Sequence, residues 1–174
     1  MVRELAKKEL KNRWIALYVE NQVGVLAKVS GLFSGKSYNL QSLTVGTTER
    51  EDVSRMTISV TCDDPTFEQI KKQLNTMVEV IKVMDLTHVP IHMKEILFAK
   101  VKGLNTAGKD EVFHIAQVFN VKVIDIGEDA ALLECMLTER RNNELIALLG
   151  KRFRQIEIVR GGSVAIESIS TSCR

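Results

Sequence analysis

The chain has 174 residues, 45% of them hydrophobic and 26% charged, which is the balance of an ordinary globular protein with a buried core. Each half carries twelve basic and eleven acidic side chains, so neither half is polycationic and charge-driven binding to nucleic acid is disfavoured. No apolar run approaches the length of a membrane span, and three widely spaced cysteines argue against a disulfide framework. We therefore expect a cytoplasmic protein.

The first half of the chain alternates strand and helix patterns. Residues 1–13 form an N-terminal extension that we interpret as a short amphipathic helix. Asp63, Asp64 and Pro65 are typical of a helix start, and residues 56–62 alternate as a strand with one buried face does. The predicted elements are a strand at 14–19, a helix over 25–33, strands at 40–45 and 56–62, a helix after Pro65 and a strand at 80–86.

The second half repeats this order after a linker, residues 87–94, that contains Pro90. The predicted strands are at 96–101, 121–126, 131–137 and 156–160, with a turn at 127–129 between the second and the third. One predicted helix has an apolar face of Val112, Ile115, Ala116 and Phe119. The other has Leu145, Leu148, Leu149 and Arg152 on one face. The sequence thus predicts an α+β fold of two tandem ferredoxin-like β-α-β-β-α-β domains, residues 14–86 and 95–174.

The topology of such a domain leaves one sheet face uncovered. Right-handed crossovers place both helices of each domain on the same face of a four-stranded antiparallel sheet. Pairing of faces or edges between subunits would cover the other face, so we predict a homo-oligomer.

The most specific motifs lie in the first domain. The segment Val19–Val29 has a strand end, a short turn with a glycine and a helix start, a pattern that resembles the ACT-domain signature. Further motifs are Gly31–Ser34, Tyr38–Gly46, Ser54–Ile58 and Gln69–Leu74. Together they resemble the regulatory small subunit of acetolactate synthase, strongly over residues 14–86 and more weakly over 95–160.

The resemblance implies an effector site shared between two ACT domains across a dimer interface. Its residues, carried over from the family's valine site, are Asn21, Gly24, Val25, Leu26, Asn39 and Leu40. The physical chemistry is consistent, because a helix N-terminus offers unpaired N–H groups to a carboxylate and Gly24 lets the backbone approach a ligand. Asn39 would meet the ligand's ammonium group. The family usually has proline where Val23 stands and glycine where Ser37 stands.

Structural roles compete with several of these assignments. From spacing alone Val25 and Leu26 are typical of a core, and Asn21 is typical of a helix N-cap. Arg55 either anchors the following turn through Glu49 or Asp52 or contacts a catalytic partner, and we favour the structural role. Cys62 and Cys135 fall on apolar strand faces and are interpreted as core residues, whereas Cys173 lies in the C-terminal tail.

No catalytic or metal-binding constellation is evident in the sequence. His88 and His92 are separated by Pro90, which disfavours a helix that would bring them together. His114 lies beside the stripe of its helix and is predicted to be a surface or boundary residue. Neither a nucleophile signature nor a phosphate-binding loop is found. We therefore assign no catalytic, cofactor or metal residue to this chain.

Three functions fit this topology. The resemblance implies a regulatory subunit that binds and activates a large catalytic subunit and confers feedback inhibition by valine, with thiamine diphosphate, magnesium and FAD held by that partner. The alternative is a stand-alone ACT-domain amino-acid sensor, such as a transcription regulator, which would need a DNA-binding module that the 13 residues before Trp14 are too few to form. RNA binding is disfavoured, because residues 56–60 carry no aromatic side chain.

Overall fold

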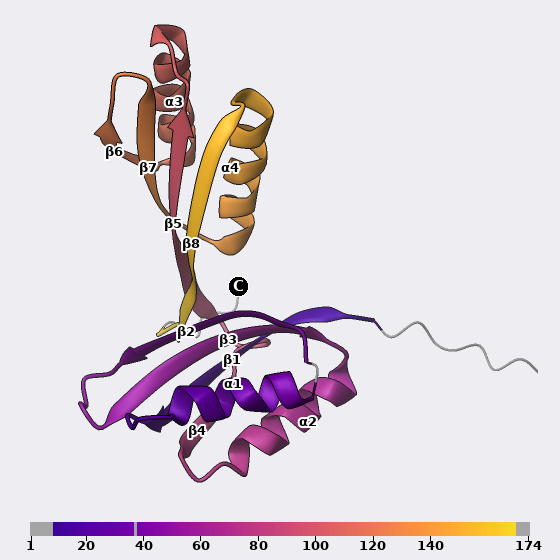
Figure 1. The fold of residues 1–174 in the computed structure, drawn as a ribbon. Helices are drawn as coiled ribbons and strands as arrows, with labels where there is room; N and C mark the ends of the chain where they lie inside the picture. Colours follow the sequence, from indigo (N-terminus) through magenta and orange to yellow (C-terminus); the bar gives the residue numbers. More distant parts are fainter. Residues whose placement is uncertain (1–8, 37, 170–174) are drawn as a thin grey trace, which may run out of the picture. The chain divides into compact units, whose positions relative to one another are not determined.

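The structure is a computed structural model that describes residues 9–36 and 38–169. These residues divide into two compact units. The N-terminal unit comprises the residues up to His92 together with those from Ala165 onward, and the C-terminal unit is Met93–Val164. The predicted α+β fold is confirmed, since the described residues form two four-stranded sheets, each accompanied by two helices (Figure 1). Ser37 and Cys173 lie outside the described residues.

The N-terminal unit has the predicted order β-α-β-β-α-β. Its elements are β1 (Lys11–Glu20), α1 (Val25–Gly35), β2 (Leu40–Thr47), β3 (Val53–Cys62), α2 (Asp64–Asn75) and β4 (Val80–Asp85). The strands are arranged β2-β3-β1-β4, so β2 and β4 are the edges. β1 begins at Lys11, which pairs with Cys62 at the end of β3. The predicted N-terminal helix therefore does not extend to Arg13, because residues 11–13 belong to the sheet.

Both helices of this unit pack on one face of the sheet. The side chains that fill the space between them alternate along the strands and recur every three or four residues along the helices, as the sequence predicted. This core comprises Ile15, Leu17 and Val19 of β1, Met56, Ile58, Val60 and Cys62 of β3, Val25, Val29 and Phe33 of α1, and Phe67, Ile70 and Leu74 of α2.

The start of α2 follows directly from its sequence. Asp63 has an extended backbone, and its carboxylate accepts a hydrogen bond from the Thr66 N–H at 3.0 Å, while Pro65 occupies the first turn. Such a cap satisfies one of the donors that a helix N-terminus leaves unpaired. The predicted helix start is confirmed.

The C-terminal unit repeats the same order. Its elements are β5 (Ile91–Lys102), α3 (Thr106–Phe119), β6 (Lys122–Ile126), β7 (Ala130–Leu137), α4 (Glu139–Arg152) and β8 (Gln155–Glu167). The start of β5, up to His92, and the end of β8, from Ala165, belong to the N-terminal unit. The sheet order is β6-β7-β5-β8. The predicted stripe of α3 is buried in full, and Leu145 and Leu149 of α4 are buried, whereas Arg152 is exposed. His114 is exposed, as predicted.

Two strands of this unit are longer than the sequence predicted. β5 begins at Ile91 rather than Ile96, inside the segment assigned to the linker. Pro90 immediately precedes the strand, where its missing N–H removes no hydrogen bond from the ladder. β8 continues past Arg160 to Glu167 through Gly161 and Gly162, and Gly162 has a φ of +79° that an L-residue rarely adopts.

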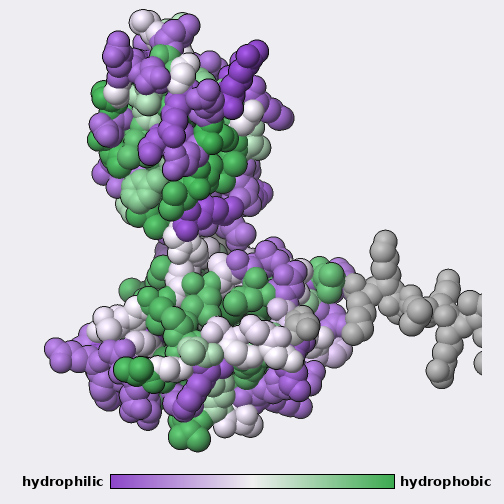
Figure 2. All heavy atoms as spheres, viewed as in Figure 1, coloured by the Kyte–Doolittle hydropathy of each residue, from purple (hydrophilic) through white to green (hydrophobic). Residues whose placement is uncertain are grey.

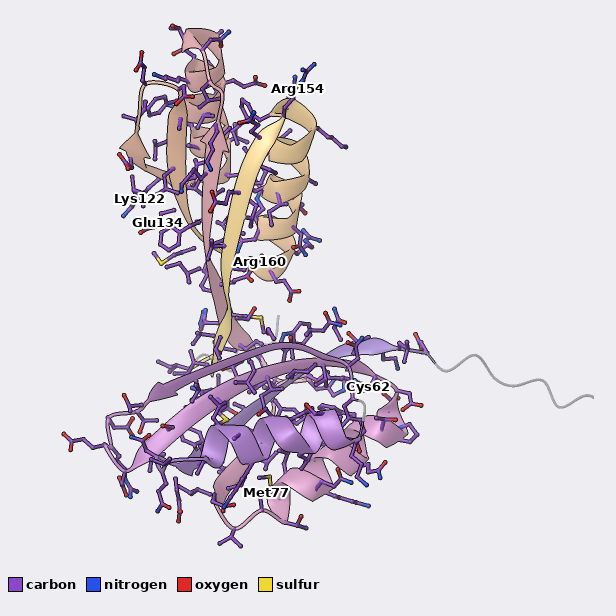
Figure 3. The ribbon with its side chains drawn as sticks, in the orientation of Figure 1. Cys62, Met77, Lys122, Glu134, Arg154 and Arg160 are labelled. Carbon is purple, nitrogen blue, oxygen red and sulfur yellow. The ribbon has the colours of Figure 1, made fainter. Side chains whose placement is uncertain are left out.

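A buried polar cluster joins three elements of the C-terminal unit. Glu95 of β5 is only 3% exposed and accepts two hydrogen bonds of 2.8 Å from the guanidinium of Arg160. Figure 3 labels Arg160 on β8. The amide of Asn142, which is fully buried on α4, donates to the same carboxylate at 2.9 Å. Burial alone would raise the pKa of Glu95, but Arg160 and Asn142 hold it below its ordinary value.

The sheet face opposite the helices carries exposed apolar side chains in the C-terminal unit, beside ion pairs of Lys100 and Lys102 with Glu157. Ile96 and Met136 are register partners that alternate with core residues of β5 and β7, and they are 42% and 57% exposed. Val159 of β8 is 58% exposed. Figure 2 shows hydrophobic surface over this unit.

Among the helices that the structure describes, none combines the length and the apolar character needed to cross a membrane.

Candidate functional site

The first turn of α1 is exposed apart from Val25 and has no capping side chain. The helix begins at Val25, and its N-cap is Gly24, whose φ of +88° places it in the left-handed region that favours glycine. No side chain caps the helix and no acidic residue lies in its first turn. The N–H groups at such an end carry partial positive charge and attract an anion such as a carboxylate.

Residues around this turn leave room for a ligand to approach. A Cβ built on Gly24 meets no atom within 4 Å. Val23, where the family usually has proline, precedes the N-cap and is fully exposed, so it lies outside the helix. Leu26 is 43% exposed and remains free to contact a ligand's side chain. Val25 is 3% exposed and belongs to the core, which confirms the structural interpretation of its spacing.

Asn21 does not cap the helix, so the prediction of an N-cap at this residue was wrong. Its side-chain amide donates to the Glu51 carbonyl at 2.8 Å and accepts from the Ser54 hydroxyl at 3.0 Å, and its backbone N–H donates to the Asp52 carbonyl at 2.8 Å. Asn21 therefore fixes the loop after β1 to the turn between β2 and β3. The N-cap of α1 is Gly24 instead, and no side chain caps this helix.

Asn39 and Leu40 lie at the other end of the sheet from Asn21. The Asn39 carbonyl accepts from the Thr61 N–H at 3.1 Å, and Leu40 is paired with Val60. Glu20, beside Asn21, is paired instead with Val53. Val53 and Val60 are separated by about 23 Å of extended strand, at roughly 3.3 Å per residue. One chain alone therefore does not bring the two parts of the predicted site together.

An ion pair secures the N-terminal part of α1. Lys28 of α1 pairs with Glu79, in the turn before β4, and the Glu79 carbonyl accepts a 2.9 Å hydrogen bond from the Glu20 N–H. The hydrogen bond from Lys28 lowers the pKa of the Glu79 carboxyl. Both ends of the loop that precedes α1 are thus attached to neighbouring turns, one through Asn21 and one through Glu79.

Arg55 does not anchor the following turn through Asp52 as we predicted, because it contacts Tyr18 instead. Its guanidinium lies over the Tyr18 ring, 5.4 Å from the centroid, on the neighbouring strand. Asp52 instead accepts hydrogen bonds of 3.1 and 2.6 Å from Arg50, and the Arg50 guanidinium lowers the pKa of that carboxyl. A cation over an aromatic face explains the position of Arg55 without a carboxylate partner.

The histidines and cysteines contact separate parts of the chain. His88 lies 3.3 Å from the Arg13 guanidinium and His92 lies 3.5 Å from the Ser168 hydroxyl. Among the residues that the structure describes, no three His, Cys, Asp or Glu side chains are grouped so that they could hold a metal ion. Cys62 and Cys135 are buried with the cores, as predicted.

Each half of the chain matches a known protein family. Residues 15–82 match the family described as an AHAS small subunit-like ACT domain, and residues 94–169 match the family described as the small subunit of acetolactate synthase. The chain is 39% identical to an acetolactate synthase small subunit of Aquifex aeolicus, over 94% of this chain and 85% of that one. It is 38% identical to a probable acetolactate synthase small subunit of Archaeoglobus fulgidus, over 87% of this chain and 94% of that one.

A solved structure agrees over almost the whole chain. The structure is similar to the crystal structure of the acetolactate synthase small subunit from Thermotoga maritima, with a TM-score of 0.83 and 33% sequence identity. The match covers 92% of this chain and 99% of that chain. The likeness therefore includes residues of both units.

Proposed function

The chain belongs to the family of acetolactate synthase small subunits, and from this premise we propose that it binds and activates the large catalytic subunit and confers feedback inhibition by valine. In this proposal the chain acts as a regulator, and the chemistry that needs thiamine diphosphate, magnesium and FAD resides in the large subunit. Valine inhibition would then be a coupling free energy between two sites, for which about 1–3 kcal/mol, or roughly 5- to 150-fold in affinity, is typical.

The observation that carries the proposal is the start of α1. Its first turn has no side-chain cap and no acidic residue, and its N-cap is Gly24, which has open space around it. An α-amino acid could place its carboxylate on these N–H groups and its branched side chain against the exposed part of Leu26.

The edge position of β2 supports a site completed by a second copy. Thr47, at the end of β2, is paired with Ser54, and the neighbouring Val53 is paired with Glu20, close to the start of α1. If β2 pairs with β2 of a second chain in antiparallel fashion, the partner's strand start lies beside this end. Asn39 and Leu40 of one chain would then approach Gly24 of the other, which a single chain does not achieve.

Reconstitution with the large subunit tests the regulatory role. The rate of acetolactate formation is measured with and without this chain and with valine, leucine or isoleucine. We expect an increase in rate on adding the chain and a decrease on adding valine. An unchanged rate and unchanged valine sensitivity would refute the proposal in favour of a stand-alone sensor.

A matched pair of variants tests the binding position. Ala27→Asp places a carboxylate on the first turn of α1, where the helix dipole favours it, so the fold should be retained or slightly stabilised. This carboxylate competes with that of the ligand, and valine binding should weaken by about tenfold or more. Ala27→Asn has nearly the same shape without the charge and should bind valine much more tightly than Ala27→Asp. Equal affinities would remove the helix start from the site.

Mixed dimers test whether the site is shared between chains. Ala27→Asp and Asn39→Ala chains are mixed after each alone has been shown to lose valine binding. In a mixed dimer of a shared site, one site contains both unmodified elements, so about a quarter of the sites in a random mixture recover. A site contained in one chain would show no recovery.

A further inference from the structure

A hollow opens on the sheet face of the N-terminal unit that lies opposite α1 and α2. Ile15, Leu17 and Val19 point from β1 to the helices, so Tyr18 between them faces the other side. The hollow has a volume of about 280 Å³, near the lower end of small-molecule sites. Its apolar lining comes from β1, β3 and β4 and comprises Tyr18, Val53, Ile81 and Met84. The sequence did not predict it, because the lining residues come from four separate segments.

The rim of the hollow carries charges of both signs. Lys82 follows Ile81 on β4, Glu49 lies in the turn between β2 and β3, and Glu167 lies at the end of β8. Arg50 also lines the hollow, but its guanidinium is engaged by the Asp52 carboxylate. Apart from the Arg50–Asp52 ion pair, one ammonium group and two carboxylates thus surround an apolar floor.

We propose that this hollow binds a free α-amino acid with an aliphatic side chain, as a second site on the chain. Lys82 would hold the ligand's carboxylate, Glu49 and Glu167 its ammonium group, and the apolar lining its side chain. Each charged group of the ligand then meets an opposite charge in the hollow. A 2-keto acid or a nucleotide fits less well, because both lack an ammonium group to oppose the two carboxylates.

The hollow is distinct from the proposed effector site but shares one structural element with it. Glu49 and Arg50 of the turn between β2 and β3 line the hollow, while the same turn accepts hydrogen bonds from Asn21 through the carbonyls of Glu51 and Asp52. Asn21 in turn precedes Gly24 at the start of α1. A ligand that orders this turn from one side therefore acts on the loop that presents the helix N-terminus on the other.

The stoichiometry of amino-acid binding by the full chain tests the second site. Equilibrium dialysis is performed with radiolabelled valine, leucine and isoleucine up to several millimolar, because charges at an exposed rim give weak binding, on the order of 0.1–1 mM. We expect two molecules bound per chain for at least one of these ligands. Lys82→Glu should remove one of them, by weakening it about tenfold or more, and leave the other unchanged. Lys72→Glu on the exposed side of α2 is the matched control and should leave both in place.

The outcomes separate this proposal from the effector site. One bound molecule per chain that is lost in Ala27→Asp and retained in Lys82→Glu would overturn the second site while the effector site stands. One molecule lost only in Lys82→Glu would support the hollow and overturn the effector site. If Lys82→Glu leaves amino-acid binding unchanged but weakens binding of the large subunit, the hollow is a protein-docking surface and the proposal is overturned.

Discussion

Arg160→Met provides the sharpest test of the energetics in this structure. The substitution leaves the Glu95 carboxylate, whose side chain is 4% exposed, with the Asn142 amide but without a guanidinium. Removing one partner of a fully buried ion pair costs about 3–5 kcal/mol, and because the Arg160 side chain is 34% exposed we expect a smaller loss, about 2–3 kcal/mol. The loss should be confined to the C-terminal unit.

The pH dependence of this loss has a definite sign. In the unmodified chain the pKa of Glu95 lies below its ordinary value, so its contribution to stability is present at neutral pH and is lost only as the pH falls below about 4.5, through the folded-state value. Without Arg160, burial raises the pKa of Glu95 and the charged carboxylate becomes unfavourable. Protonation then relieves the penalty, and the difference between variant and unmodified chain should be smaller at pH 5 than at pH 7.5.

Hydrogen exchange of backbone amides in β7 measures the stability of this unit separately from the other. We expect exchange to be faster by roughly 30- to 140-fold at pH 7.5, since each 1.4 kcal/mol corresponds to a factor of ten. Arg154→Met, an exposed arginine of the same unit, is the control and should change exchange little (Figure 3). Adding Glu95→Gln to Arg160→Met should recover part of the loss. Equal effects of the two arginine substitutions, or a loss independent of pH, would refute this reasoning.

Three further predictions concern individual residues. Gly24→Ala should lower the free energy of unfolding by about 1–2 kcal/mol in urea denaturation, because its φ of +88° strains an L-residue although space is free around it. Asp63→Ala should cost about 1 kcal/mol by removing the cap on Thr66, whereas Asp63→Asn should retain most of the stability; equal losses would contradict the capping role. Burial raises the pKa of the Cys135 thiol to about 11, so alkylation followed by mass spectrometry at pH 8 should modify it far more slowly in the native chain than in urea.

The sequence determined the elements of the fold because their signals are local. Alternation along β3, the stripe of α3 and the cap at Asp63 depend on residues within one turn or strand, and each predicts the observed element. The family resemblance likewise depends on contiguous motifs. The sequence did not predict where β5 begins and β8 ends, because the length of a strand depends on how far its partner strand pairs with it. Neither Pro90 nor Gly161 reveals where that pairing stops.

The candidate site was only partly accessible to sequence reasoning. Gly24 and Leu26 follow from the turn and the helix that begin there, but spacing could not show that Asn21 binds the turn between β2 and β3 instead of the helix end. Only the tertiary structure reveals that Asn39 and Gly24 lie near opposite ends of the sheet and that β2 is an edge strand. The hollow around Tyr18 and the cluster around Glu95 were also decided there, because each assembles side chains from strands and turns far apart in the chain. Local preferences are encoded by neighbouring residues, whereas the meeting of distant side chains depends on register and packing that no single segment contains.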